Sequence, residues 1–120
     1  WAVAAVRAYH KWEADRIVGE VNNGGDLVEV NIRTVDPGVP YEAVTASRGK
    51  LIRAEPVSAL YEQGKVHHVG TFPQLEDQMV EWVPGEKSPD RMDALVWAIT
   101  KLIPAAQTAD PSRFLRYAVR

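Results

Sequence analysis

Absences in the sequence exclude several kinds of chemistry. The chain of 120 residues has no cysteine, which excludes disulfides, thiolate metal sites and cysteine nucleophiles. The lack of disulfides fits an intracellular protein. No apolar run approaches the roughly 20 residues that a membrane-spanning helix needs, and no stretch has the pattern of a signal peptide. With 14 basic and 16 acidic residues the net charge is −2, so no overall positive field indicates a nucleic-acid partner, although a local basic patch is compatible with it.

The sequence also lacks a P-loop. The pairs Gly49-Lys50 and Gly64-Lys65 stand outside the GxxxxGK(S/T) context, so we expect no ATP binding by that route. A chain of this length is predicted to make one domain with one core. It begins at Trp1, without methionine and inside a helical pattern, and we expect it to be a fragment of a longer protein.

Hydrophobic periodicity divides the chain into alternating helices and strands. The order of these patterns predicts an α/β fold with parallel strands. Helical patterns cover residues 1–14, the stretch from the turn at 47–50 to about residue 63, residues 72–83 and residues 88–103, and short strand patterns cover residues 16–21, 41–46 and 65–70.

Residues 26–35 fit either a strand or a helix. Val28, Val30 and Ile32 share a face at a period of two, whereas Val28, Ile32 and Val35 share a face at helical spacing. The glycines just before this stretch also suit a helix start. The residue pattern alone leans slightly to a strand.

Individual residues sharpen these predictions. Gly64 is expected to end its helix, and the last helix should begin with Ser88 as N-cap and Pro89 as first helical residue. The four tryptophans suit packing in the core or at element edges better than a base-stacking platform. The first helix is predicted to bury one face, formed by Ala2, Ala5, Val6, Tyr9 and Trp12.

The stretch from Arg16 to Asp26 holds the first candidate functional residue. Glu20 follows a short apolar strand and precedes a turn rich in asparagine and glycine, which includes Asn22, Gly24 and Gly25. It therefore belongs at the carboxyl end of a strand, where ligands bind in open α/β sheets. A carboxylate there needs a metal ion or a basic partner if it is buried, and is otherwise a solvated loop residue.

Two more acids begin the last helix. Asp90 and Asp93 are spaced i, i+3 and project from one side of its first turns. The helix dipole accounts fully for Asp90. Asp93 immediately precedes an apolar run, Ala94 to Ala98, and a carboxylate at the edge of a buried stripe is the better ligand candidate.

If Glu20 and Asp93 meet, they form a carboxylate pair suited to Mg²⁺ or Mn²⁺, because hard divalent ions prefer oxygen ligands. Two ions about 4 Å apart would clamp the attacking and leaving oxygens of a phosphodiester, and they would require a third acid. His67 and His68 neighbour each other on a predicted strand, where they face opposite ways, and each is better interpreted as structural.

The compact basic cluster of the chain consists of Arg48, Lys50 and Arg53. On a loop and a helix start these side chains suit nonspecific contacts with DNA phosphates. A solvated basic face explains them about equally well.

Three stretches together resemble a known family. They are AYHKWEADRIVGEVNNGGDLV at 8–28, SRGKLIRAEPVSALYEQGKVHHVGTFPQLEDQM at 47–79 and SPDRMDALVWAITKL at 88–102. Each is weak alone, but jointly they resemble the C-terminal nuclease domain of the terminase large subunit of tailed bacteriophages and prophages, the motor that packages and cuts viral DNA.

The resemblance implies an RNase H-like fold with three acids around two divalent metal ions, Mg²⁺ or Mn²⁺. Glu20 matches the second acid and Asp93 the third, with Asp90 as a neighbour, and the crossover in the family favours a helix at 26–35. The first acid and the opening strands of the family lie before this chain. We therefore expect residues 1–104 to form a partial domain with weak or no nuclease activity, and residues 105–120 to form an extension or a short helix. We also expect an exposed sheet edge, through which two copies of the chain could pair as a dimer.

By this resemblance, the parent protein is a metal-dependent endonuclease that cuts concatemeric double-stranded DNA in the cytoplasm of a bacterial host, without a membrane. Its implied partners are an ATPase domain, a small terminase subunit and the portal. Two alternatives stay open. One is another RNase H-like nuclease of the resolvase or integrase type, and the other is a non-catalytic docking or regulatory module of the packaging motor.

Overall fold

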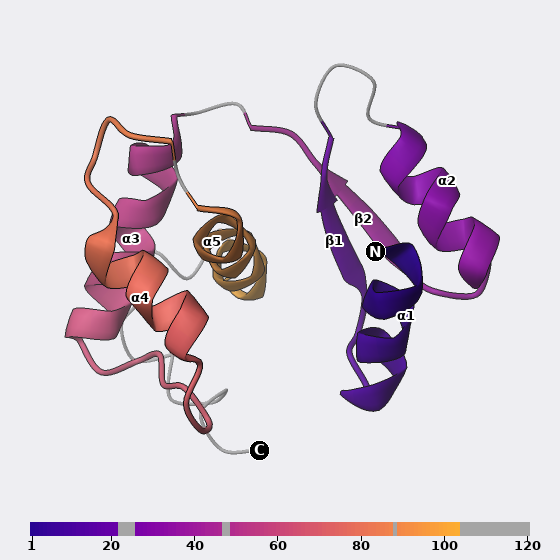
Figure 1. The fold of residues 1–120 in the computed structure, drawn as a ribbon, viewed down its shortest axis with the longest axis horizontal. Coiled ribbons are helices and arrows are strands. Elements are labelled where there is room, and N and C mark those ends of the chain that lie inside the picture. Colours follow the sequence, from indigo (N-terminus) through magenta and orange to yellow (C-terminus); the bar gives the residue numbers. More distant parts are fainter. Residues whose placement is uncertain (22–25, 47–48, 88, 104–120) are drawn as a thin grey trace. The chain divides into compact units, whose positions relative to one another are not determined.

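The computed structural model describes residues 1–21, 26–46, 49–87 and 89–103, with the backbone but not the side chain of Lys50. Their elements are drawn in Figure 1. No helix within these ranges is both long and apolar enough to cross a membrane. The chain divides into two compact units, which are described separately below.

The first unit, Trp1–Ser47, is a β–α–β crossover preceded by a helix. In chain order it contains α1 (Ala2–Lys11), β1 (Ile17–Glu20), α2 (Asp26–Val35) and β2 (Tyr41–Val44) (Figure 1). The first helix and both strands lie where the sequence patterns predict them, and all three are shorter than predicted.

The pairing of β1 with β2 places Glu20 at the carboxyl edge of the sheet. The strands are parallel, with Ile17 opposite Tyr41 and Glu20 opposite Val44. The ladder extends one step further, because the Val21 N–H donates to the Val44 carbonyl at 2.8 Å. A parallel pair needs a crossover connection, which α2 supplies, so both strands end at the same edge.

Residues 26–35 form a helix, as the resemblance predicts, although the pattern alone leaned to a strand. Ile32 is fully buried and Val28 is half-buried, whereas Val30 is 55% exposed. A strand would have placed Val30 on the same face as Ile32. Asp26 and Glu29 in the first turn fit the helix dipole.

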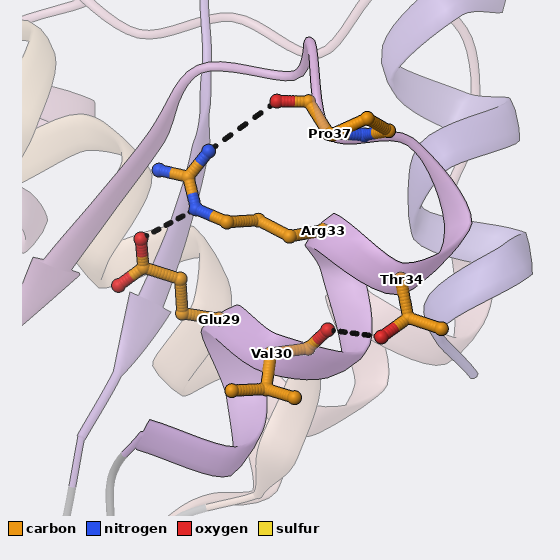
Figure 2. Close-up of polar contacts among 5 residues, drawn as sticks. All are labelled: Glu29, Val30, Arg33, Thr34 and Pro37. Carbon is orange, nitrogen blue, oxygen red and sulfur yellow. Dashed lines mark hydrogen bonds and ion pairs between the residues drawn. The ribbon is translucent and has the colours of Figure 1, made fainter.

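The end of α2 is tied to the loop that leads into β2 (Figure 2). The Arg33 Nε donates to Glu29 at 2.7 Å, and its Nη1 donates to the Pro37 carbonyl at 3.4 Å. The Thr34 hydroxyl donates back to the Val30 carbonyl at 2.7 Å. An exposed helical ion pair contributes only about 0.3–0.5 kcal/mol, so these contacts orient the loop more than they stabilise the unit.

Burial in the first unit follows the predicted helix face with one exception. Trp12 is 73% exposed, so its predicted packing is wrong. Trp12 is the C-cap of α1, one residue beyond the last helical residue Lys11, where the chain leaves the helix. Trp1 is also exposed, contrary to prediction, while Trp82 and Trp97 are half-buried.

The core of the first unit consists of Val6, Ile32 and Val39, surrounded by Ala2, Ala5, Tyr9, Ile17 and Tyr41.

The second unit, Arg48–Arg120, contains three helices in its described part. They are α3 (Lys50–Glu62), α4 (Pro73–Glu81) and α5 (Asp90–Leu102) (Figure 1). Pro56 lies inside α3 and not at its first turn. The core lies between α3 and α5 and consists of Val57, Leu60, Val96 and Ile99.

The strand predicted at 65–70 is wrong, because this segment has no strand structure and connects α3 to α4. Gly64 has a φ of 64° and ends α3 as predicted. Its N–H donates to the Tyr61 carbonyl and the Lys65 N–H donates to the Leu60 carbonyl, both at 2.9 Å, which is the Schellman arrangement. The segment thus begins as part of the helix cap. The alternating pattern of Val66 and the histidines resembles a strand and gives no sign of this cap.

Gly19 on β1 lies against the ring of Tyr41 on β2. A Cβ at this position would meet the phenolic oxygen and would lie 2.9 Å from ring carbons, closer than the roughly 3.5–4.0 Å at which carbon atoms pack. The Tyr41 oxygen is itself buried without a hydrogen-bond partner among the described residues. Burial, and secondarily the Glu29 carboxylate, raise the pKa of the Tyr41 phenol. A side chain at position 19 would therefore have to displace the Tyr41 ring.

We therefore expect Gly19→Ala to lower the free energy of unfolding by about 1–3 kcal/mol, because the added methyl group overpacks the sheet. Urea denaturation followed by circular dichroism measures the loss. Tyr41→Phe removes the nearest atom and should partly restore the stability of Gly19→Ala. Alone it should be neutral or stabilising, since it removes an unsatisfied hydroxyl. A Gly19→Ala variant as stable as the parent chain would contradict the close contact.

Candidate functional site

Glu20 occupies the position that the sequence predicts for it. It is the last residue of β1, half-buried, at the carboxyl edge of the parallel pair. Its neighbour in register, Val44, is 5% exposed. A half-buried carboxylate loses part of its hydration, so a cationic partner is favourable at this position.

A second carboxylate on the same face of the sheet was not singled out from the sequence. Glu42 is opposite Val18, and alternation along a strand places Val18, Glu20, Glu42 and Val44 on one face. The Arg16 guanidinium donates to Glu42 at 3.0 Å. The signal was available in the alternation of the second strand, but the register that brings Glu42 beside Glu20 is a tertiary property.

Asp90 and Asp93 both lie in the first turn of α5, as predicted. Asp90 is exposed and Asp93 is half-buried. The apolar run after Asp93 predicts that Asp93 is the more buried of the two. The Asp93 N–H donates to the Pro89 carbonyl at 3.0 Å. Pro89 is the N-cap and not the first helical residue, so the helix begins one residue later than predicted; Ser88 lies outside the described residues.

The first turn of α5 is capped by a side chain from α4. The Gln78 Oε1 accepts hydrogen bonds from the N–H groups of Arg91 at 3.1 Å and Met92 at 3.3 Å. These are N–H groups that a helix cannot satisfy internally. Gln78 thus holds the turn that carries Asp90 and Asp93. Sequence reasoning missed it, because a cap from another helix leaves no local signal.

The described residues contain no group of three or more histidine and acidic side chains that could hold one metal ion. Glu20 belongs to the first unit and Asp93 to the second, so their pairing stays a prediction. Their carboxylates are the donor type that Mg²⁺ and Mn²⁺ prefer. By donor chemistry the residues suit these ions, and by number they form an incomplete set.

Of the three residues in the predicted basic cluster, the structure describes the side chain of Arg53 only. Arg53 is half-buried in α3, and its guanidinium carbon lies 4.6 Å from the ring centroid of Trp97 in α5. Lys50 is the first residue of α3. Arg48 lies outside the described residues, as do Asn22, Gly24 and Gly25, for which the sequence predicts a turn.

His68 connects two helices of the second unit. Its Nδ1 lies 2.9 Å from a Glu76 oxygen and its Nε2 lies 2.8 Å from the Tyr61 hydroxyl. Because a carboxylate only accepts, Nδ1 donates to Glu76, and Nε2 shares the second hydrogen bond with the Tyr61 hydroxyl. Burial, and then the Glu76 charge, raise the pKa of Tyr61. Both ring nitrogens are engaged within the protein, in agreement with the structural role predicted for this histidine.

The same network governs the response of this unit to acid. The hydrogen bond from His68, and then the one from the Phe72 N–H at 3.1 Å, hold the pKa of Glu76 below its ordinary value of 4.5. A carboxyl group with a lowered pKa stabilises the fold above its unfolded pKa, and this stabilisation is lost as the pH falls through the folded pKa.

We therefore expect Glu76→Gln to destabilise the chain at pH 7, with a gap from the parent chain that narrows below about pH 4.5. Urea denaturation between pH 3 and pH 7 measures it. Glu62→Gln, which removes an exposed carboxylate from the same unit, is the control for loss of one negative charge. A gap that stays constant through the acid range would refute the assignment to Glu76.

A family model described as terminase RNaseH-like domain matches residues 1–102, a range that contains every helix and strand from α1 to α5. No curated protein and no solved structure matches significantly. The resemblance seen in the sequence is confirmed, and with it the α/β, RNase H-like fold class.

The small parallel sheet with five helices in the described residues is consistent with a truncated form of that fold. The family indicates a nuclease-type module of a terminase. From the match and the architecture together, the chain belongs to the family of terminase RNaseH-like domains.

Proposed function

We propose that this chain is part of a metal-dependent endonuclease that hydrolyses phosphodiester bonds of concatemeric double-stranded DNA during viral DNA packaging. The observation that carries the proposal is the position of Glu20, half-buried at the carboxyl end of β1, in a chain that belongs to a terminase RNaseH-like family. Ligands of open α/β sheets bind at this edge.

In this proposal Glu20 and Asp93 hold divalent metal ions, two in the intact domain, and Asp90 assists. Bound Mg²⁺ or Mn²⁺ supplies Lewis acidity and an activated water to phosphodiester hydrolysis. The chain itself orients the carboxylates. The turn with Asn22, Gly24 and Gly25 positions Glu20, and Gln78 supports Asp93 through the hydrogen bonds that cap α5.

The basic residues have a separate role. Arg48, Lys50 and Arg53 contact phosphates of the DNA backbone, which neutralises charge without reading sequence. Arg53 is the member of this set whose side chain the structure describes, stacked on Trp97.

The donor set is incomplete, and we infer that the first acid of the active site is supplied from outside this chain. Residues 1–104 then form a partial nuclease domain with 105–120 as an extension. Alone, the fragment would bind metal weakly and cut DNA poorly or not at all.

The proposed setting is the cytoplasm of a bacterial host, where the partners would be double-stranded DNA, the ATPase domain, the small terminase subunit and the portal. Among the described residues β1 pairs only with β2, so a free strand edge is available to a further strand of the parent protein or to a second copy. Unpaired strand edges are ready templates for such pairing.

We expect Glu20→Gln and Asp93→Asn each to weaken Mn²⁺ binding by the chain about tenfold or more, because each removes a charged ligand. Isothermal titration calorimetry or Mn²⁺ electron paramagnetic resonance measures the affinity. Glu42→Gln is the matched control, since it removes a carboxylate from the same sheet face as Glu20 that is already paired with Arg16.

Binding that survives both substitutions, or that falls equally in Glu42→Gln, would reject the assignment of the acids. A non-catalytic docking module would then be the better description of the chain. In the parent protein the same two substitutions should abolish DNA cleavage and leave DNA binding in place.

A further inference from the structure

The second unit has an apolar groove between its described helices. Its buried lining residues are Val57 of α3 and Met92 and Val96 of α5, and Met79 and Trp82 line it from α4 and the C-cap of that helix. The groove has a volume of about 330 Å³, near the lower end of the range of about 300–1,000 Å³ for pockets that hold small ligands. It therefore has room for a few apolar side chains of a short segment.

The rim of the groove is acidic. Glu55 of α3 is exposed, and it is the one charged side chain among the described residues that line the groove. Leu51, one helical turn before it, also lines the groove and is 47% exposed. An apolar groove with an acidic rim is complementary to a segment that combines bulky apolar residues with basic ones.

The sequence after α5 contains a segment of this composition. Residues 104–120 lie outside the described residues. Their sequence groups bulky apolar side chains with arginines, namely Phe114, Leu115, Tyr117 and Val119 with Arg113, Arg116 and Arg120. Asp110 is the single acid of this stretch. Large apolar side chains gain free energy when they leave water, and the charge of the segment is opposite to that of Glu55.

The connection from α5 is long enough to bring this segment to the groove. Ile103 packs against the core that contains Val57 and Val96, so the chain leaves α5 beside two helices that form the groove. Val96 lies about 10 Å back along α5, at about 1.5 Å per residue, whereas residues 104–113 span up to about 33 Å when extended. A segment tethered by a short linker has an effective concentration of roughly millimolar, so even a weak contact would be populated.

We propose that segment 113–119 of this chain docks in the groove between α3, α4 and α5. Phe114 and Leu115 insert among the apolar lining residues. Arg113 and Arg116, on either side of that pair, place positive charge beside Glu55. The proposal goes beyond the proposed function, because it assigns an interaction surface that neither the candidate acids nor the basic cluster use, and it does not depend on nuclease activity.

The composition of the chain makes the test selective. Its two methionines, Met79 and Met92, both line the groove. Isotope labelling of methionine methyl groups therefore gives NMR signals that report on the groove. Because the chain has no cysteine, Ser112→Cys carries a single nitroxide spin label next to the segment. In a dilute sample the label should broaden both methionine signals, and chemical reduction of the nitroxide should restore them.

Matched variants separate apolar docking from charge. Phe114→Ser combined with Leu115→Ser should lower the docked population about tenfold or more and so remove the broadening, because two apolar side chains no longer gain from burial. Glu55→Gln should weaken the broadening, with a larger effect at low salt than at high salt. Glu62→Gln is the control, since Glu62 is an exposed acid of α3 that does not line the groove. Circular dichroism confirms that each variant is folded.

Three results would overturn the proposal. One is an absence of broadening in the labelled chain, and another is broadening that survives the two serine substitutions. The third is broadening between molecules when spin-labelled chains are mixed with isotope-labelled chains, since the occupant of the groove would then be a second copy. If the serine variant does not fold, the comparison of Glu55→Gln with Glu62→Gln decides, and equal effects of the two would overturn the proposal.

Discussion

The parallel pairing of β1 with β2 is the constraint on which the first unit depends. Parallel strands cannot be joined by a hairpin, so the chain must cross over, and α2 is the crossover. The crossover buries Ile32 against Val6 and Val39. The same pairing places the ring of Tyr41 directly over Gly19. One topological requirement thus explains the core, the glycine and the location of Glu20 at the carboxyl edge.

The second unit depends on a different interaction, the packing of α3 against α5. The core cluster between the two helices, formed by Val57, Leu60, Val96 and Ile99, is aliphatic, and the polar contacts lie around it. Gln78 caps α5 from α4, and His68 bridges Tyr61 of α3 and Glu76 of α4. Aliphatic packing supplies most of the stabilisation, whereas these directional bonds select one arrangement of the three helices.

Charged residues of opposite sign are placed on different parts of the scaffold. The half-buried acids Glu20 and Asp93 stand at the end of a strand and in the first turn of a helix, positions that rigid elements define. Arg53 stands on α3, with its guanidinium carbon over the ring of Trp97. In the proposed function the acids would bind metal ions and basic residues would bind phosphate, which are the parts that metal-assisted phosphodiester hydrolysis uses. The arrangement therefore fits the family to which the chain belongs.

The sequence alone determined most of the secondary structure and the type of fold. Amphipathic spacing located four of the five described helices to within a few residues, because helix formation depends on local periodicity and end signals such as Gly64. For residues 26–35 the spacing was ambiguous, and the family resemblance decided it. Hydrophobic spacing gave wrong predictions in two places. Residues 65–70 begin with the cap of α3 and form no strand, and Trp12 lies just beyond the end of α1. The candidate acids were located by their positions relative to these elements.

Only the tertiary structure decided which side chains from different elements meet. The register that places Glu42 on the face of Glu20, the cap from Gln78, the His68 bridge and the stack of Arg53 on Trp97 all join residues that local patterns treat as unrelated. Local propensity acts over one or two helical turns or a few strand residues. Contacts across elements are instead selected by the simultaneous packing of the apolar faces, and no single stretch of sequence encodes that outcome.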